Sequence, residues 1–292
     1  MRRTVPVVAA VVALGAATVA SQPFRARVDL VQVTATVLDA SGRLVKGLTK
    51  DDFEIWEDGV AERVAQFTAE RVPVSVGILL DASDSMRGQP IVDARDGVDR
   101  FLELLEPQDE VFVATFNHDA RLAARWRQPP SALKHVLDGV RPSGGTAIWD
   151  ALAEASSLFD RRLHGRAAFV VVSDGADTAS DRSVIQALDI IRRSDVFVYA
   201  IAIDPPDARG STRVNPESLR DITSWTGGYT EVVQGTADLG PAAARIAEEL
   251  NAQYTIGYSS SKPPDGSWRS IRVRAGDYRV RARRGYFATP PR

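Results

Sequence analysis

The middle of the chain alternates between short runs of apolar residues and longer segments whose apolar residues recur at helical spacing. Val74–Leu80 is apolar almost throughout, as expected for a strand covered on both faces, whereas Ile91–Leu105 carries its apolar residues three or four positions apart. Strands separated by helices pair in parallel through right-handed crossovers. Residues 72–259 are therefore predicted to form an α/β domain with a doubly wound, mostly parallel sheet flanked by helices.

The same patterns predict the other elements of this domain. The further strands expected are Glu110–Phe116, a short edge strand Ala120–Trp126, Ala167–Ser173, Val196–Ile203, Tyr229–Val233 and Tyr254–Tyr258. The further helices expected are Ser131–Leu137, Ala147–Leu163, Ser183–Arg193, Asp238–Asn251 and one that starts at Asn215-Pro216, with the asparagine as N-cap.

The two ends of the chain carry the pattern of antiparallel strands. In Val28–Leu38 apolar and polar residues alternate, so one face of the strand is apolar and the other is polar. Phe53–Glu57 and Ala61–Thr68 are two further strand candidates. Neither the N-terminal segment 22–71 nor the C-terminal segment 260–292 is long enough to be stable alone. We therefore expect the two segments to pack together as a small β-sandwich-like module.

Residues 1–21 have the pattern of a secretory signal peptide. Arg2 and Arg3 precede the apolar stretch Val5–Leu14, and Thr18-Val19-Ala20 offers a cleavage site. The stretch is shorter than the about 20 residues that a spanning helix needs, although a retained N-terminal anchor stays the alternative. We expect an exported mature protein, periplasmic or secreted, with no integral membrane span after cleavage.

Composition excludes several classes of function. The formal net charge of −2 argues against a general nucleic-acid binder, which would carry a strong basic excess. The absence of cysteine excludes disulfides, thiolate catalysis and cysteine-based metal sites. The sequence has no phosphate-binding loop, no Gly-x-Ser-x-Gly elbow and no His-Glu-x-x-His helix. These absences disfavour three common classes of enzyme, and together with the resemblance described below they lead us to expect a protein that is not an enzyme.

Oxygen-bearing side chains gather where strands of the predicted sheet end. Asp81, Ser83 and Ser85 follow the first strand at alternate positions, Thr146 follows a Gly-Gly turn, and Asp174 directly follows a buried strand. Carboxylate and hydroxyl oxygens are the ligands that a hard divalent cation prefers. Ligands of such sheets bind beyond the carboxyl ends of the strands. These five residues are the candidate metal ligands.

Together, the motifs resemble the metal-ion-dependent adhesion site of von Willebrand factor type A domains, and the resemblance covers roughly Val72–Ser259. The matching segments are Asp81-Ala82-Ser83-Asp84-Ser85, Gly144-Gly145-Thr146 and Ser173-Asp174-Gly175. The resemblance implies direct ligation by the two serines and the threonine, with the two aspartates in or just outside the inner coordination sphere. Mg²⁺ fits this set best, with Mn²⁺ and Ca²⁺ as alternatives.

The two ends carry a resemblance as well. Val45–Phe67, with Leu48–Glu54 and Glu57-Asp58-Gly59, looks like the start of bacterial "VWFA-related domain" proteins, and Arg283–Phe287 looks like their end. The resemblance then covers nearly the whole mature chain. It supports the architecture and leaves the partner and the oligomeric state open.

The resemblance implies a way of binding. A site with few formal charges leaves its cation electrophilic, so that an Asp or Glu side chain of a protein ligand would complete the coordination. One alternative is that the aspartate and serines only cap the helix that follows them. Another is a structural or assembly component of the cell envelope, whose metal is structural or lost. A metal-dependent hydrolase is a third, weaker hypothesis.

The C-terminal segment is rich in arginine. Eight Arg and two Asp lie between Asp265 and Arg292. Such a basic face could meet an anionic partner. Because arginines at alternate positions of a strand commonly form a solvated face and discourage edge-to-edge pairing, we expect the solvated face here.

Overall fold

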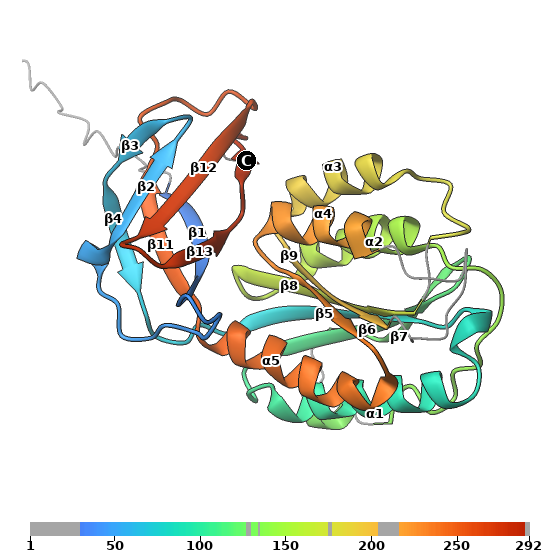
Figure 1. Ribbon diagram of the computed structural model, residues 1–292. Coiled ribbons are helices and arrows are strands. Elements are labelled where there is room, and N and C mark those ends of the chain that lie inside the picture. The colour runs from blue at the N-terminus through green and yellow to red at the C-terminus, as the bar shows by residue number, and fades with distance from the viewer. Residues whose placement is uncertain (1–29, 127–129, 134, 175–176, 204–215, 290–292) are drawn as a thin grey trace, which may run out of the picture.

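The computed structural model describes residues 30–126, 130–133, 135–174, 177–203 and 216–289. Within these residues the chain forms an α/β domain with a six-stranded sheet and, beside it, two four-stranded antiparallel sheets made from both ends (Figure 1). This architecture confirms the predicted fold class. The predicted signal peptide, residues 1–21, and the predicted N-cap Asn215 lie outside the described residues. None of the helices described is long and apolar enough to cross a membrane.

The six-stranded sheet is the centre of the α/β domain. Its order is β10-β9-β8-β5-β6-β7, and neighbouring strands pair in parallel except β6 and β7. The strands are β5 (Val74–Asp81), β6 (Glu110–Phe116), β7 (Ala120–Ala124), β8 (Arg166–Ser173), β9 (Phe197–Ile203) and β10 (Thr230–Val233). Every residue of β5, β6, β8 and β9 is buried. Their continuous apolar runs therefore reflect cover on both faces.

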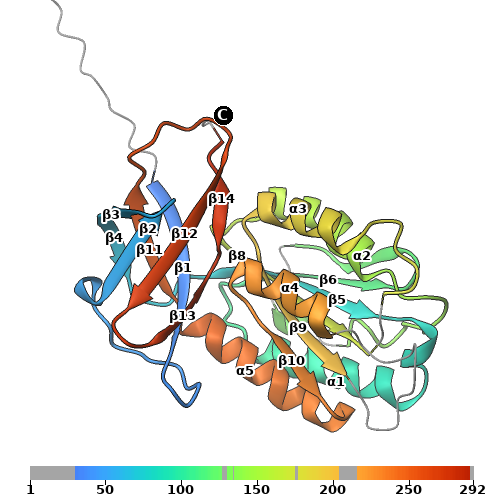
Figure 2. The same cartoon turned by 45° about the horizontal axis from the view of Figure 1, so that its top comes forward.

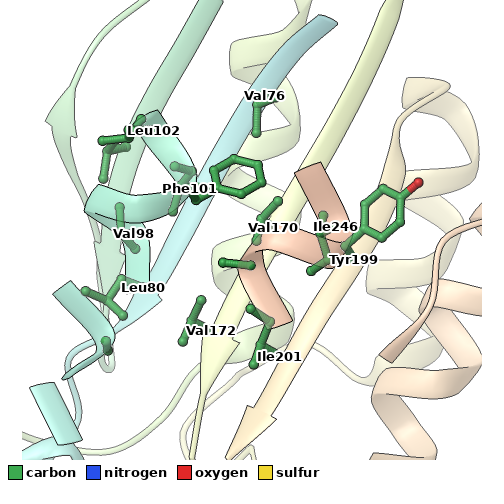
Figure 3. Close-up of a cluster of buried hydrophobic side chains, with 14 of the residues drawn as sticks. Val76, Leu80, Val98, Phe101, Leu102, Val170, Val172, Tyr199, Ile201 and Ile246 are labelled. Carbon is green, nitrogen blue, oxygen red and sulfur yellow. The ribbon is translucent and has the colours of Figure 1, made fainter. Parts of the chain in front are cut away.

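Helices supply that cover (Figure 1). They are α1 (Gln89–Leu104), α2 (Ile148–Ser156), α3 (Val184–Ser194), α4 (Pro216–Thr226) and α5 (Leu239–Asn251). Helices α1 and α5 pack on one face of the sheet, and α2, α3 and α4 pack on the other. Figure 3 shows part of the first core, where Phe101 of α1 and Ile246 of α5 lie beside Val170 of β8.

The two ends of the chain interleave in the antiparallel sheets (Figure 2). One sheet has the order β13-β1-β11-β4 and the other the order β14-β12-β2-β3. The strands are β1 (Leu30–Leu38), β2 (Phe53–Glu57), β3 (Val60–Glu62), β4 (Val64–Thr68), β11 (Tyr254–Ser259), β12 (Trp268–Ala275), β13 (Arg279–Ala282) and β14 (Gly285–Phe287). The single strand expected over Ala61–Thr68 is thus two strands, β3 and β4, which join different sheets. We call this part of the protein the terminal module.

The strand expected over Tyr254–Tyr258 does not continue the six-stranded sheet. As β11, it pairs with β1 and β4 of the terminal module, with Ile256 opposite Val33. Tyr254, Ile256 and Tyr258 are buried in the core of that module. An inner antiparallel strand can be buried on both faces, so its sequence resembles that of a parallel strand.

Two predicted helices are shorter than expected, and side-chain and backbone geometry explains both. The segment Ser131–Leu137 forms only a 3₁₀ turn, Pro130–Leu133, and His135 then adopts a left-handed conformation (φ 64°). The segment Ala147–Leu163 is helical as α2 and tightens to a 3₁₀ turn from Ser157 to Arg161. There the Ser156 hydroxyl donates to the Leu152 carbonyl at 2.7 Å, a bond that competes with helix continuation. Among the described residues, the other 3₁₀ turns are Lys50–Asp52, Asp84–Met86 and Thr236–Asp238.

A buried carboxylate joins the two sheets of the terminal module. Glu57 of β2 accepts hydrogen bonds from the hydroxyls of Tyr258, Ser260 and Tyr286 and from the guanidinium of Arg269, at 2.6–3.0 Å. Burial alone would raise the pKa of Glu57, but these bonds outweigh it and lower the pKa. Glu57 is 0% exposed and Arg269 is 2% exposed. Glu57 is the buried counter-charge of Arg269, whose Nη2 also lies 3.5 Å from the exposed carboxylate of Asp265.

Glu57→Gln is expected to lower the free energy of unfolding by about 3–5 kcal/mol, because the buried Arg269 would keep only the exposed Asp265, 3.5 Å away, as a counter-charge. Glu54→Gln changes an exposed residue of the same strand and should stay within about 0.5 kcal/mol of wild type. Urea denaturation of both variants measures the difference. Equal denaturation midpoints for the two variants would contradict the role given to this ion pair.

Candidate metal centre

The first candidate ligand ends the central strand of the six-stranded sheet. Asp81 is the last residue of β5 and is 0% exposed. Its Oδ1 accepts a hydrogen bond from the Ser83 backbone N–H at 2.8 Å, and its Oδ2 accepts one from the Ser173 hydroxyl at 2.6 Å. Ser173 ends β8, the parallel neighbour of β5. The carboxylate is therefore fixed by its own loop and by the adjacent strand.

Two serines and a second aspartate continue from Asp81. The hydroxyl oxygens of Ser83 and Ser85 are 3.0 Å apart, and the Ser85 hydroxyl donates to Asp174 Oδ1 at 2.8 Å. Asp174 directly follows β8 and is 9% exposed. Four of the five candidate ligands, drawn from two distant segments of sequence, thus form one hydrogen-bonded cluster at the carboxyl ends of β5 and β8.

Thr146 lies on a loop that packs against this cluster. The loop is held by bonds from Ser143 N–H to the Ala82 carbonyl at 2.8 Å and from Asp84 N–H to the Gly144 carbonyl at 2.9 Å. Gly144 has φ +79°, and a Cβ there would come within 2.6 Å of His118. Thr146 is 4% exposed. Its hydroxyl makes no hydrogen bond to the other four candidates within the described structure, so only the backbone of its loop is bonded to the Asp81–Ser85 loop.

The serines do not cap the helix that follows them. Helix α1 begins at Gln89, its N-cap residue is Gly88, and no side chain bonds to the cap. Ser83 precedes only the short turn Asp84–Met86, again without a capping bond from its side chain. The hydroxyls of Ser83 and Ser85 are therefore directed to each other and to Asp174. Helix capping does not explain this loop.

The electrostatic environment disfavours negative charge on both aspartates. Burial raises the pKa of Asp81 to about 6, the hydrogen bonds from Ser173 and Ser83 oppose this rise, and the charge of Asp174 adds to it. Burial also raises the pKa of Asp174, against the bond from Ser85. In the parts of the chain that the structure describes, no Lys, Arg or His forms an ion pair with either carboxylate. A bound cation would compensate both charges.

The chemistry of these side chains fits a hard divalent ion. Two carboxylates and the hydroxyls of two serines lie together, with a threonine on the adjoining loop, and all of them offer oxygen. Among the residues described, no group of three or more His, Cys, Asp or Glu side chains is arranged to hold a metal. A site here would therefore depend on hydroxyls as much as on carboxylates. Such a ligand set suits Mg²⁺, which usually keeps several waters and uses few carboxylates.

The family model of the von Willebrand factor type A domain matches residues 75–239. The chain belongs to this family. Over 204 residues it is 25% identical to inter-alpha-trypsin inhibitor heavy chain H2 of Mesocricetus auratus, covering 64% of this chain and 21% of that protein. The heavy chain H2 of Mus musculus is 21% identical over the same length. The chain thus spans about one fifth of the length of these curated relatives.

Solved structures share the fold of this von Willebrand A domain protein. A von Willebrand factor type A structure from Catenulispora acidiphila matches with a TM-score of 0.56 and 15% identity, over 86% of this chain and 71% of that one. An aerotolerance-related membrane protein from Bacteroides fragilis matches with a TM-score of 0.52 and 24% identity, over 61% and 98% of the two chains. The von Willebrand factor domain of the pili tip protein Mfa5 from Porphyromonas gingivalis matches with a TM-score of 0.51 and 14% identity, over 63% and 96%.

Three residues that are not among the five candidate ligands organise the site. Ser173 holds Asp81, as described above. The Asn117 side-chain amide donates to the Ser143 carbonyl at 2.8 Å and so positions the loop that carries Thr146. The Thr178 hydroxyl accepts from the Thr146 N–H at 3.0 Å. Ser173 and Asn117 end or follow strands at the same sheet edge as Asp81, which is the signal that could have found them.

Other polar residues near the cluster have different roles. Asp177 accepts hydrogen bonds from the Trp149 N–H at 3.2 Å and from the Ser180 hydroxyl at 2.6 Å, and so caps the first turn of α2. Asp84 is exposed and pairs with Arg87 at 2.7 Å.

Asp81→Asn is expected to stabilise the metal-free protein at neutral pH. The folded protein binds a proton at Asp81 more tightly than the unfolded chain does, so stability falls as the pH rises from about 4 to about 6 and the loss is complete above that range. The difference in pKa corresponds to about 3 kcal/mol at pH 7.5. Denaturation of wild type and Asp81→Asn in EDTA, at pH 4.5 and at pH 7.5, measures this difference in the free energy of unfolding. A variant with no gain over wild type at pH 7.5 would contradict this account.

Proposed function

We propose that this chain is a non-enzymatic binding protein that recognises a protein ligand through a divalent cation. The residues that would hold the ion are Asp81, Ser83, Ser85, Thr146 and Asp174. The observation that carries the proposal is the pair of buried carboxylates, which are joined by serine hydroxyls and have no cationic partner within the described structure. Burying such a pair without compensation is unfavourable, and a cation removes the cost.

The ligand set suggests how a partner would bind. The two carboxylates supply the only formal charges among the five residues, so a divalent ion held here keeps affinity for a further anionic oxygen. An Asp or Glu side chain of a protein ligand fits that requirement. Ser173 and the Ser83 N–H would keep Asp81 oriented during binding, since each already holds one of its oxygens. We infer Mg²⁺ as the ion, with Mn²⁺ and Ca²⁺ to be tested beside it.

Family membership supports a binding role, because von Willebrand A domains are in general interaction domains. The residues described offer no histidine that contacts the serines of the cluster, which disfavours a serine hydrolase. We further propose that the protein is exported. That proposal rests on Arg2, Arg3 and the apolar stretch Val5–Leu14 that follows them.

Metal binding is expected to raise the melting temperature of wild type in proportion to the logarithm of ion concentration above Kd. At a concentration one hundred times Kd, the gain in stability is about 2.7 kcal/mol. Asp81→Asn should lose this response, although it is the more stable protein in EDTA. Asp84→Asn alters an exposed carboxylate of the same loop and should keep the response.

Thermal unfolding in Mg²⁺, Mn²⁺ and Ca²⁺ series, each against an EDTA blank, makes this measurement. A wild-type melting temperature that no ion moves would refute the metal site. An equal rise in wild type and Asp81→Asn would show that the ion binds elsewhere.

Partner binding is expected to require the ion. A protein ligand captured by wild type in Mg²⁺ should be released by EDTA and should not bind Asp81→Asn, whereas Asp84→Asn should capture it. Changing the contacting Asp or Glu of that ligand to its amide should abolish capture. If EDTA lowers the melting temperature but leaves the captured partner in place, the ion is structural and the recognition mechanism is wrong.

A further inference from the structure

The proposed metal centre is recessed, which restricts the shape of a ligand that can reach it. Four of the candidate ligands are at most 9% exposed, namely Asp81, Ser83, Thr146 and Asp174. Among the five, Ser85 is the exposed residue, so the cluster is open to solvent beside it. A flat partner surface would be held away by the surrounding loops. The acidic side chain of a ligand must therefore lie on a narrow projecting segment, such as a tight turn.

The terminal module carries such a turn between β12 and β13. The Tyr278 N–H donates to the Ala275 carbonyl at 3.0 Å, which leaves Gly276 and Asp277 as the two residues of the turn. Gly276 has φ +50°, and a Cβ there would meet no atom within 4 Å. Gly276, Asp277 and Tyr278 are all exposed. The turn thus stands clear of the rest of the protein, with a carboxylate at its tip.

The carboxylate of Asp277 differs from those of other aspartates at turns of the module. Asp39, Asp58 and Asp265 each accept hydrogen bonds from side chains of the module itself. Asp277 makes no hydrogen bond or ion pair within the described parts of the chain. Its carboxylate is therefore available to a cation outside its own module.

The turn and the metal centre also carry opposite charge. Residues 274–279 contain two Arg and one Asp, and the side chains of Arg274 and Arg279 are exposed. The segments at the metal-centre end contain seven Asp and four Arg before any ion binds, and they are 81–88, 117–121, 141–150 and 174–182. Complementary charge of this kind favours the encounter of two surfaces and selects between partners.

The same comparison argues against a second exposed aspartate of the module. Asp51 lies in the 3₁₀ turn Lys50–Asp52 and is exposed. Its neighbour Asp52 adds a like charge, which would oppose its approach to the acidic metal-centre end. Asp277 is thus the better ligand of the two, and Asp51 serves as a control.

The turn and the metal centre lie at opposite ends of the molecule (Figures 1 and 2). The metal centre is where β5 and β8 end. The terminal module lies where strands of the same sheet begin, since Gly227 closely approaches both Phe197, the first residue of β9, and Ala282 of β13. The 8 residues of β5 alone span roughly 25 Å. A molecule therefore cannot bind its own Asp277, and the contact requires two copies.

We propose that the acidic ligand of the metal centre is Asp277 of a second copy of this chain. This inference rests on the proposed function, because it names the partner of the same site. The carboxylate enters beside Ser85 and completes the coordination of the ion. Tyr278, which is 45% exposed, then packs on the surrounding loops. Because the two surfaces in contact are different, copies join head to tail, and repetition gives an open chain or a closed ring.

Sedimentation velocity of the full chain over a concentration series, in Mg²⁺ and in EDTA, tests the proposal. Wild type should form oligomers in Mg²⁺ and remain monomeric in EDTA. Asp277→Asn should raise the Kd of self-association about 30-fold or more, because the amide removes one member of a charge pair. Asp277→Glu keeps the carboxylate and should fall between the two. Asp51→Asn is the matched control and should associate as wild type does.

Mixing two variants gives a sharper test of the contact. Asp81→Asn keeps the acidic ligand but loses the ion, whereas Asp277→Asn keeps the ion but loses the ligand. Neither variant should self-associate. Their mixture retains one intact contact and should form a dimer with one copy of each, and nothing larger, in Mg²⁺ only.

Thermal unfolding separates this inference from the proposed function. Asp277→Asn should keep the rise in melting temperature that Mg²⁺ gives to monomeric wild type, because its own metal centre is unchanged. If Mg²⁺ raises the melting temperature but wild type stays monomeric, or if Asp277→Asn associates as strongly as wild type, the second copy is not the ligand and the metal site stands. Self-association that persists in EDTA would overturn the proposal as well. If no ion changes the melting temperature, both proposals are wrong.

Discussion

Burying a carboxylate costs free energy unless donors or a cation compensate it, and one edge of the six-stranded sheet buries two. Asp81 and Asp174 end or follow adjacent parallel strands, so the topology alone forces their charges together. Hydrogen-bond donors from Ser173, the Ser83 backbone and Ser85 partly compensate the two carboxylates. These bonds reduce the cost and leave the pKa of Asp81 raised. The remaining imbalance is the reason why we propose a cation site at this end of the sheet.

At the opposite end of the α/β domain, another buried carboxylate is compensated by an arginine of the protein itself. Glu249 of α5 is buried, and burial raises its pKa, but Arg281 of β13 pairs with it. The hydroxyls of Thr36 in β1 and Tyr199 in β9 donate to the same carboxylate at 2.9 and 3.0 Å. One carboxylate thereby joins a helix, the parallel sheet and the terminal module. The module is fixed to the domain through its polar contacts as well as its apolar ones.

Whether a helix or strand could be predicted from the sequence depends on whether local pattern or distant contacts determine its place and its ends. The runs that became β5, β8 and β9 were predicted because burial on both faces leaves a strong apolar signal. The same signal misassigned β11, whose burial comes from an antiparallel sheet. The end of α2 could not be predicted, since it depends on where the Ser156 hydroxyl bonds.

Some residues of the candidate site could likewise be predicted from the sequence, and others could not. Asp81, Ser83, Ser85 and Asp174 were found because parallel strands bring their carboxyl ends to one edge. Asn117 and Thr178 act through hydrogen bonds to the backbone of the loop that carries Thr146. No pattern in the sequence predicts these bonds.

The interleaving of the two ends has a consequence for the order in which the chain folds. Strand β1 lies between β13 and β11, and its residue Thr36 bonds to a residue 213 positions away. The strands of the six-stranded sheet all lie between Val74 and Val233, so that sheet can assemble while the C-terminus is still being synthesised. Strand β1 stays unpaired on both edges until its neighbours β11 and β13 have been synthesised. Long-range pairing of this kind is slow and exposes strand edges to other chains. Among the described strands, β1 is therefore one of the last to gain both of its neighbours.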